Sequence, residues 1–389
     1  MKNKNAFINL LIFVGVFLNA YSAFAFPEMI RDGYINCTSC HISPNGGGVL
    51  NAYGRQSSSA VLSTWGGENE AKPFYNLFKQ PEWIDTGAFV SGVEQVQNNS
   101  SVSEGHFWFM QAAVEGAARF GANQKWTLDL AGGISPDVLN GLQVPGSSPF
   151  ISPRHYVMYQ LDDNTTVRAG KYLADYGVYF QDHTIPTRQG IGFDEGMETY
   201  NLEYSYQGDK YSGSITADFG RLDNPQLLFD KGVAATGAVA LGDTSKVGYS
   251  GFFGSENSKN RELTGPYVLL GFTHQLYLIG EADFQFTQPN GANSTKGIAT
   301  YERLGYEIKK GFQLYWMQDT YVYDFGGNFD PTTINPMYGV FSNRLIATGP
   351  GLYWYPRPHF YIQFEVQQQF SPDFPSAQTY GFLVGSIYL

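Results

Sequence analysis

Two cysteines and a histidine form the motif with the most specific chemistry in this sequence. Cys37, Cys40 and His41 read C-T-S-C-H, and the chain has no other cysteine. CxxCH is the attachment motif of c-type haem, in which each thiol forms a thioether and the adjacent histidine ligates the iron. The spacing therefore predicts one covalently bound haem c, held by Cys37 and Cys40, with His41 as an axial ligand of the haem iron.

Two other kinds of site use similar residues. A thioredoxin-like CxxC needs a βαβ scaffold, and only about 11 residues separate the expected mature N-terminus from Cys37. A structural zinc site needs four tetrahedral ligands, whereas the adjacent side chains of Cys40 and His41 point apart. Both alternatives fit the sequence less well than haem attachment.

The second axial ligand of the haem iron is not fixed by the motif. Methionine in this position would raise the reduction potential relative to histidine, and an open position would admit a small ligand. His183 ranks first among the candidates because it lies in the longest irregular stretch of the chain. The candidates are Met29, His106, Met110, His155, His183, Met337 and His359.

The N-terminus has the features of a secretory signal peptide. Lys2 and Lys4 form a basic region, residues 7–18 form an apolar core, and residues 23–25 read Ala-Phe-Ala, an A-x-A cleavage signal. This core is shorter than the roughly 20 residues that a transmembrane helix needs. We therefore expect residues 1–25 to be cleaved on export, which also fits covalent haem attachment outside the cytoplasm.

The composition predicts β-structure with two different faces. The chain has 27 Tyr, 30 Phe and 45 Gly among 389 residues, and its net charge is −11. A transmembrane β-barrel, with a polar lumen and an apolar, aromatic outer face, explains this mixture in an exported chain. A large soluble β-protein is the alternative, because strand alternation does not say which face meets lipid. The acidic balance excludes a basic nucleic-acid footprint and favours the approach of cations.

Alternating stretches broken by Gly, Asn, Asp and Pro begin after residue 82, so we expect an all-β, antiparallel barrel over residues 83–389. At roughly 19 residues per strand and connection, this length gives about 16 strands, with 14 or 18 as alternatives. The clearest predicted strands are 87–96, 106–119, 126–134, 165–172, 198–206, 211–220, 246–253, 267–275, 276–286, 301–308, 312–323, 345–355, 360–370 and 379–389.

The lengths of the connections predict one barrel rim with short turns and one with longer loops. Tight turns are expected at 123–124, 207–209 and 309–311. The long irregular stretch 174–196 predicts a loop folded into the lumen, although a mobile external loop is the alternative. Before the barrel, residues 26–67 form the expected haem segment and 68–82 a linker. The haem segment has too little apolar surface for an independent core, so haem and the barrel wall would have to supply it.

An exported chain with one CxxCH near its mature N-terminus, followed by a barrel, resembles the fused monohaem c-type cytochrome–porins of the bacterial outer membrane. The best-known members take electrons from extracellular ferrous iron and pass them to periplasmic cytochromes. Only Cys37, Cys40 and His41 carry over residue by residue. Residues 26–34 lack the Ala-Pro…Arg-Gln-Thr run that precedes the haem motif in those iron oxidisers, so the electron donor stays open.

Three functions follow from these features. The first is an outer-membrane electron conduit between an extracellular redox donor or acceptor, for example Fe(II), and a periplasmic c-type cytochrome. The second is a diffusion porin whose haem is structural or sensory, and the third is a haem enzyme such as a peroxidase. An iron(II) oxidase would be the enzyme class of the conduit. The sequence contains no GxSxG, HExxH or phosphate-binding loop, so we do not expect a hydrolase and assign no catalytic residue.

Overall fold

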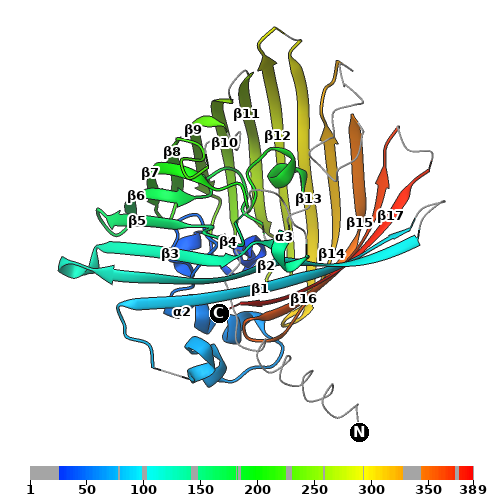
Figure 1. The fold of residues 1–389 in the computed structure, drawn as a ribbon. Helices are drawn as coiled ribbons and strands as arrows, with labels where there is room; N and C mark the ends of the chain where they lie inside the picture. The colour runs from blue at the N-terminus through cyan, green and yellow to red at the C-terminus, as the bar shows by residue number, and fades with distance from the viewer. Residues whose placement is uncertain are drawn as a thin grey trace.

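Strands whose side chains alternate between two environments build the wall of the molecule. In β14 (Phe312–Val322), Gln313, Tyr315 and Met317 are buried in the interior, whereas Leu314 and Trp316 are 45% and 54% exposed on the outside. Because successive side chains of a strand point to opposite faces, one sequence serves an apolar outer face and a filled interior. Figure 1 shows these strands in chain order around the barrel.

The computed structural model describes residues 26–77, 79–98, 103–141, 148–180, 182, 185–224, 230–256, 259–291, 293–326, 343–372 and 376–388. The expected signal peptide, residues 1–25, lies outside this part of the chain. The other strands are β1 (Ile84–Asn98), β2 (Ser103–Phe120), β3 (Trp126–Ile134), β4 (Phe150–Ile151), β5 (His155–Gln160), β6 (Thr165–Tyr172), β7 (Thr199–Gln207), β8 (Tyr211–Asp218), β9 (Lys231–Ala240), β10 (Ser245–Glu256), β11 (Lys259–Gly271), β12 (Leu276–Pro289), β13 (Thr295–Lys309), β15 (Arg344–Arg357), β16 (Phe360–Phe370) and β17 (Gln378–Tyr388).

The sheet closes on itself. Each strand pairs antiparallel with its neighbour, and β17 pairs with β1, with Tyr388 opposite Phe89. Both β4 and β5 pair with β3, so they form one interrupted strand and the barrel has 16 strands. The predicted fold class and strand number are confirmed.

The clearest predicted strands did not include β5 or β9, because β5 is short and β9 is rich in Ala and Gly, which have low strand propensity. One predicted strand is wrong at its end. The predicted strand 267–275 runs past the end of β11, which stops at Gly271. The hydroxyl of Thr273 accepts a hydrogen bond from the backbone N–H of Leu276 (3.0 Å), a local contact that favours a turn over a strand.

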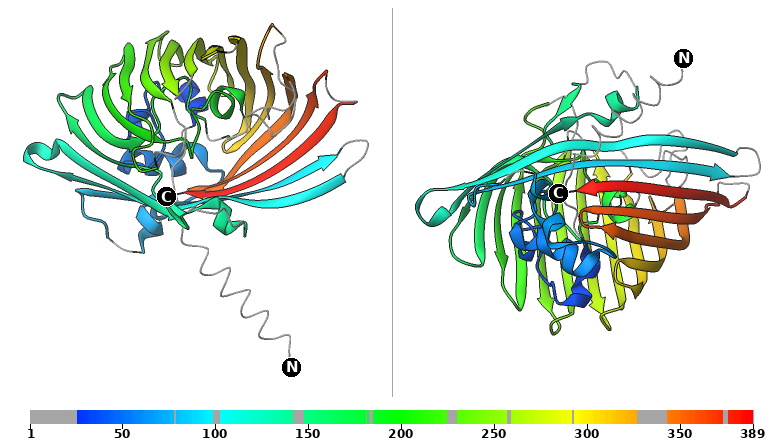
Figure 2. Two further views of the ribbon diagram at one scale, coloured as in Figure 1. Left: turned by 45° about the horizontal axis from the view of Figure 1, so that its top comes forward. Right: turned by 90° about the horizontal axis from the view of Figure 1, so that it is seen from below.

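An N-terminal plug, residues 26–77, fills one mouth of the barrel. Figure 2 shows its first part, in darker blue, within the ring of strands, and its last part, in lighter blue, outside the ring. The Nδ2 of Asn36 donates to the carbonyl of Gly208 (3.0 Å), and the hydroxyl of Thr64 donates to the carbonyl of Lys310 (3.1 Å). Both acceptors lie in predicted tight turns, so the plug sits at the short-turn rim. Its elements are η1 (Pro27–Asp32), η2 (Cys37–Ser39), α2 (Ala52–Ser57), η3 (Ser58–Leu62), η4 (Glu68–Ala71) and η5 (Pro73–Asn76).

A lumenal loop, residues 173–198, crosses the interior from β6 and β7 to the strands around β12. The hydroxyl of Tyr176 donates to Asp283 (2.9 Å), and the backbone N–H of Val178 donates to Glu281 (3.1 Å). Both carboxylates belong to β12, so the predicted lumenal position is confirmed. The remaining short helices are η7 (Pro186–Gly190) within this loop, η6 (Ala122–Gln124) and α3 (Pro136–Leu139). In the described parts of the chain, no helix is long and apolar enough to cross a membrane.

Candidate functional site

The cysteine–histidine motif forms a tight turn inside the plug. The carbonyl of Cys37 accepts the backbone N–H groups of Cys40 (3.1 Å) and His41 (2.9 Å). His41 then pairs antiparallel with Leu50 through an isolated bridge. The backbone is thus fixed on both sides of the imidazole, which is a requirement for a ligand that must hold one orientation.

Three consecutive glycines place a hydrogen-bond acceptor beside this imidazole. Gly46, Gly47 and Gly48 have φ angles of 83°, 68° and 63°, a left-handed run that other residues rarely adopt. The resulting loop brings the carbonyl oxygen of Gly47 to 3.0 Å from Nδ1 of His41. A carbonyl can only accept a hydrogen bond, so Nδ1 carries the proton and the ring's lone pair lies on Nε2. This is the tautomer of a histidine that binds metal through Nε2.

A fourth glycine lets α2 pack against the motif. A Cβ atom on Gly54 would overlap the carbonyl oxygen of Cys40, so no larger residue fits there without a backbone shift. Asn51 begins the helix: its side-chain oxygen accepts the N–H of Gly54 (2.8 Å), and its own backbone N–H donates to Cys40 (2.9 Å). The helix start and the haem motif are therefore one packed unit.

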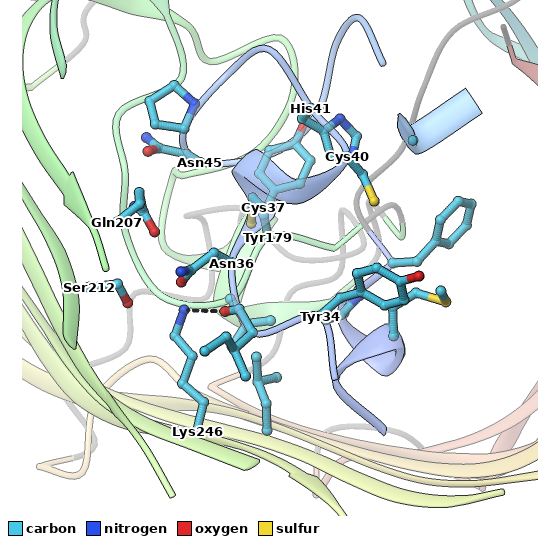
Figure 3. Close-up of a pocket in the computed structure, with 18 of the residues that line it drawn as sticks. Tyr34, Asn36, Cys37, Cys40, His41, Asn45, Tyr179, Gln207, Ser212 and Lys246 are labelled. Carbon is cyan, nitrogen blue, oxygen red and sulfur yellow. Dashed lines mark hydrogen bonds between the residues drawn. The ribbon is translucent and has the colours of Figure 1, made fainter. Parts of the chain in front are cut away.

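Cys37, Cys40 and His41 all line one cavity of about 1130 Å³, part of it open to solvent. Figure 3 shows the three side chains on one side of this space and Lys246 of the barrel wall across it. The Nζ of Lys246 donates to the carbonyl of Ile35 (3.1 Å) and so ties the plug to β10. The wall and the lumenal loop contribute further lining residues, among them Gln207, Ser212, Thr236, Tyr267, Asp175 and Tyr179.

The electrostatics of the two cysteines do not suit a nucleophile. Burial raises the pKa of Cys37, and burial followed by the neighbouring Cys37 raises the pKa of Cys40 to about 11. Thiols with raised pKa are protonated at neutral pH, whereas redox-active CxxC motifs have lowered pKa values. The two cysteines are not joined in a disulfide.

The arrangement fits a c-type haem. The two thiols and the imidazole of His41, whose Nδ1 is held by the carbonyl of Gly47, line one cavity, as attachment of a c-type haem requires. Cys37 and Cys40 would hold the group covalently and His41 would bind its iron. Among the residues that the structure describes, no group of three or more His, Cys, Asp or Glu could hold a separate metal ion.

The predicted candidates for the second ligand lie in different places. Met29 lines the cavity. His106 is exposed on β2, and His155 contacts Ser152 and Tyr200. Met110 lines a separate cavity, and His359 is buried at the turn between β15 and β16. His183, ranked first, and Met337 lie outside the described residues, so the structure does not place them.

Sequence reasoning missed the residues that the barrel adds to the cavity. Lys246, Thr236 and Tyr267 stand on β10, β9 and β11 at positions that alternate inward. An inward position can be read from alternation, but its height relative to the plug depends on the register of every strand before it. No local signal in the sequence marks these residues.

No protein-family model matches the sequence, and a search of curated proteins also gives no match. Solved structures do match. The outer membrane channel DcaP of Acinetobacter baumannii has a TM-score of 0.55 at 10% identity, over 80% of this chain and 99% of that one. The anion-selective porin from Comamonas acidovorans has a TM-score of 0.59 at 10% identity, over 78% and 98%.

OmpT of Vibrio cholerae, in its trimer form, has a TM-score of 0.57 at 11% identity, over 79% of this chain and 99% of that one. At these identities the similarity concerns the fold. The chain therefore has the fold of the outer-membrane porins, a closed antiparallel barrel of 16 strands.

Proposed function

We propose that this protein is a porin-like barrel of the bacterial outer membrane that conducts electrons through one c-type haem carried by its plug. The electrons pass between an extracellular donor or acceptor, for example Fe(II), and a periplasmic c-type cytochrome. The observation that carries the proposal is the single cavity lined by Cys37, Cys40 and His41 within the mouth of a barrel. Residues 1–25 act as the export signal that is removed on the way.

Different residues would attach the haem, bind its iron and anchor the plug. Cys37 and Cys40 attach the haem, and His41 binds its iron with Nδ1 held by the carbonyl of Gly47. When bound, the haem supplies one-electron exchange between ferrous and ferric iron. Lys246 and Asn36 hold the plug against the wall.

The position of the plug at the short-turn rim favours a haem that is accessible from the periplasm. In transmembrane barrels of this type the short turns face the periplasm and the long loops face outward. The plug sits at the short-turn rim, so its exposed residues Thr38 and Ser39 would face the periplasm. A periplasmic cytochrome would then approach the haem from this side, while the external partner acts through the lumen.

A diffusion porin with a structural or sensory haem is the second candidate. Two observations favour it: the fold matches channel proteins, and the lumenal loop narrows the interior as a constriction would. In this case liposome swelling would be unchanged by Cys37→Ala.

The test is the visible spectrum of intact cells before and after addition of Fe(II), with a Cys37→Ala/Cys40→Ala double variant as control. We expect the reduced c-type α-band to rise in the wild type and to be absent from the control. Haem that is reduced only after lysis with dithionite would favour the porin with a structural haem. Absence of any c-type band from the wild type would contradict haem attachment.

A further inference from the structure

We propose that Met29 would bind the haem iron as a second protein ligand besides His41. This inference rests on the proposed function, because it needs a haem at Cys37 and Cys40. It assigns a metal ligand that precedes the CxxCH motif in the chain and that local spacing does not reveal.

Met29 lies in the wall of the candidate haem cavity. Its side chain is 8% exposed and lines the same cavity as Cys37, Cys40 and His41. It belongs to the apolar cluster that contains Leu50, against which Cys40 packs. The Met29 side chain is therefore largely removed from water.

The short helix that carries Met29 is fastened on both sides of it. The hydroxyl of Tyr355 donates to the carboxylate of Glu28 (3.2 Å), and Arg31 forms an ion pair with Glu307 (2.8 Å). Glu28 and Arg31 are both fully buried. Because the residues flanking Met29 are anchored to the barrel wall, the position of its side chain is restricted to the cavity side of η1.

No other described methionine, and no described histidine besides His41, lines this cavity. Met158 packs beside Tyr156 in a different cluster. Met317, on β14, belongs to the same apolar cluster as Met29 but does not line the cavity. Within the described residues, elimination thus leaves one soft ligand of the right type.

The chemistry of the thioether agrees with the proposed role. Sulfur ligands of this kind are soft and favour ferrous iron, so methionine raises the reduction potential of a haem relative to a second histidine. An apolar surround acts in the same direction, because it disfavours the extra charge of ferric iron. A haem of high potential can accept electrons from a weak donor such as ferrous iron.

The test compares purified full-length wild type with Met29→Leu and the matched control Met317→Leu, both of which nearly conserve side-chain volume. For ferric wild type we expect the long-wavelength charge-transfer band of sulfur-ligated haem. We expect Met29→Leu to lose this band, to show a lower midpoint potential and to bind carbon monoxide rapidly in the ferrous state. Met317→Leu should match the wild type in all three measurements.

Retention of the band and of the potential in Met29→Leu would overturn the assignment. A second measurement needs no variant: in ferrous wild type labelled with ¹³C-methyl methionine, an axial methionine methyl is shifted far upfield by the haem ring current. Absence of a shifted methyl would also overturn the assignment. Wild type that carries no covalent haem on a denaturing gel would instead contradict the proposed function itself, so the two failures are distinguishable.

Discussion

The N-terminal plug and the lumenal loop both fill the inside of the barrel, but they are attached in different ways. The plug uses buried ion pairs to the wall, such as Arg55 with Asp85 (2.7 Å), and backbone packing against its own glycines. The loop uses hydrogen bonds to two carboxylates of β12 and the packing of buried apolar side chains such as Ile191 and Phe193. The plug therefore depends in part on a close contact between backbone segments at Gly54, whereas the loop is held through side chains of the wall.

This difference separates two roles. A plug that holds a haem, as proposed here, must fix the haem ligands, and the close packing around Cys40 and His41 suits that role. A segment that narrows a channel needs only to occupy the lumen, and contacts with side chains of the wall are sufficient. Substitutions in the plug should consequently have larger effects than comparable substitutions in the loop.

The largest effect is expected for Gly54→Val. Its side chain would meet the backbone carbonyl of Cys40, which no rotamer can avoid, so the haem motif and α2 cannot both keep their positions. We expect trypsin to cleave the plug of the folded barrel at least about tenfold faster than in wild type. Gly67→Val is the control, because a Cβ there meets nothing within 4 Å. Equal protection of the two variants would mean that the plug is not rigidly packed.

The second effect concerns Asp85 on β1, which pairs with Arg55 of the plug and with Arg119 (2.8 Å) of β2. Asp85→Asn would leave Arg55 buried without a charge partner, which costs roughly 3–5 kcal/mol. Arg55 also donates to the carbonyl of Leu50, the residue that bridges to His41. We expect the plug to leave the mouth part of the time, which would raise single-channel conductance in planar bilayers. Glu104→Gln, at an exposed position, should leave the conductance unchanged. An equal change in both variants would show that the ion pair between Arg55 and Asp85 does not hold the plug in place.

The loop gives a smaller effect. Tyr176→Phe removes one buried hydrogen bond to Asp283 and should destabilise the loop by about 1–2 kcal/mol. We expect more frequent conductance fluctuations with little change in plug protection. Tyr211→Phe, at an exposed position on β8, is the control. Faster trypsin cleavage of the plug in Tyr176→Phe would show that the plug and the lumenal loop are coupled and not attached independently.

Most strands of the barrel wall could be predicted from the sequence, but the contacts between the plug, the loop and the wall could not. Alternation reveals strands such as β14, because successive side chains of a strand point to opposite faces and each face has its own polarity. It failed at β9, where small residues hide the pattern. The CxxCH motif names Cys37, Cys40 and His41 because its chemistry is local.

The partners of the motif follow from three-dimensional contacts. Arg55 and Asp85 lie 30 residues apart, and Lys246 reaches Ile35 across 211. No spacing rule links such positions, since each depends on where the plug settles within a closed barrel. Met29 was one of seven candidates in the sequence, and only the cavity separates it from the others that the structure describes.

The smallest effect tests a titratable residue of the lumenal loop that also lines the plug cavity. Asp175 lies in the lumenal loop and lines the plug cavity. Its carboxylate accepts a hydrogen bond from the hydroxyl of Ser214 (2.6 Å). Burial, and then the charge of Glu203, raise its pKa to about 6, while Arg168 and Lys246 act in the opposite direction.

As pH rises through this value, the deprotonated carboxylate adds a negative charge beside the cavity. Negative charge favours ferric over ferrous haem, so the midpoint potential should fall between about pH 5 and 7, by less than about 59 mV per pH unit. Asp175→Asn should remove this slope, whereas Asp209→Asn, in the exposed turn after β7, should keep it. An unchanged slope in Asp175→Asn would mean that the loop carries no charge to the haem site, and that the plug alone sets its potential.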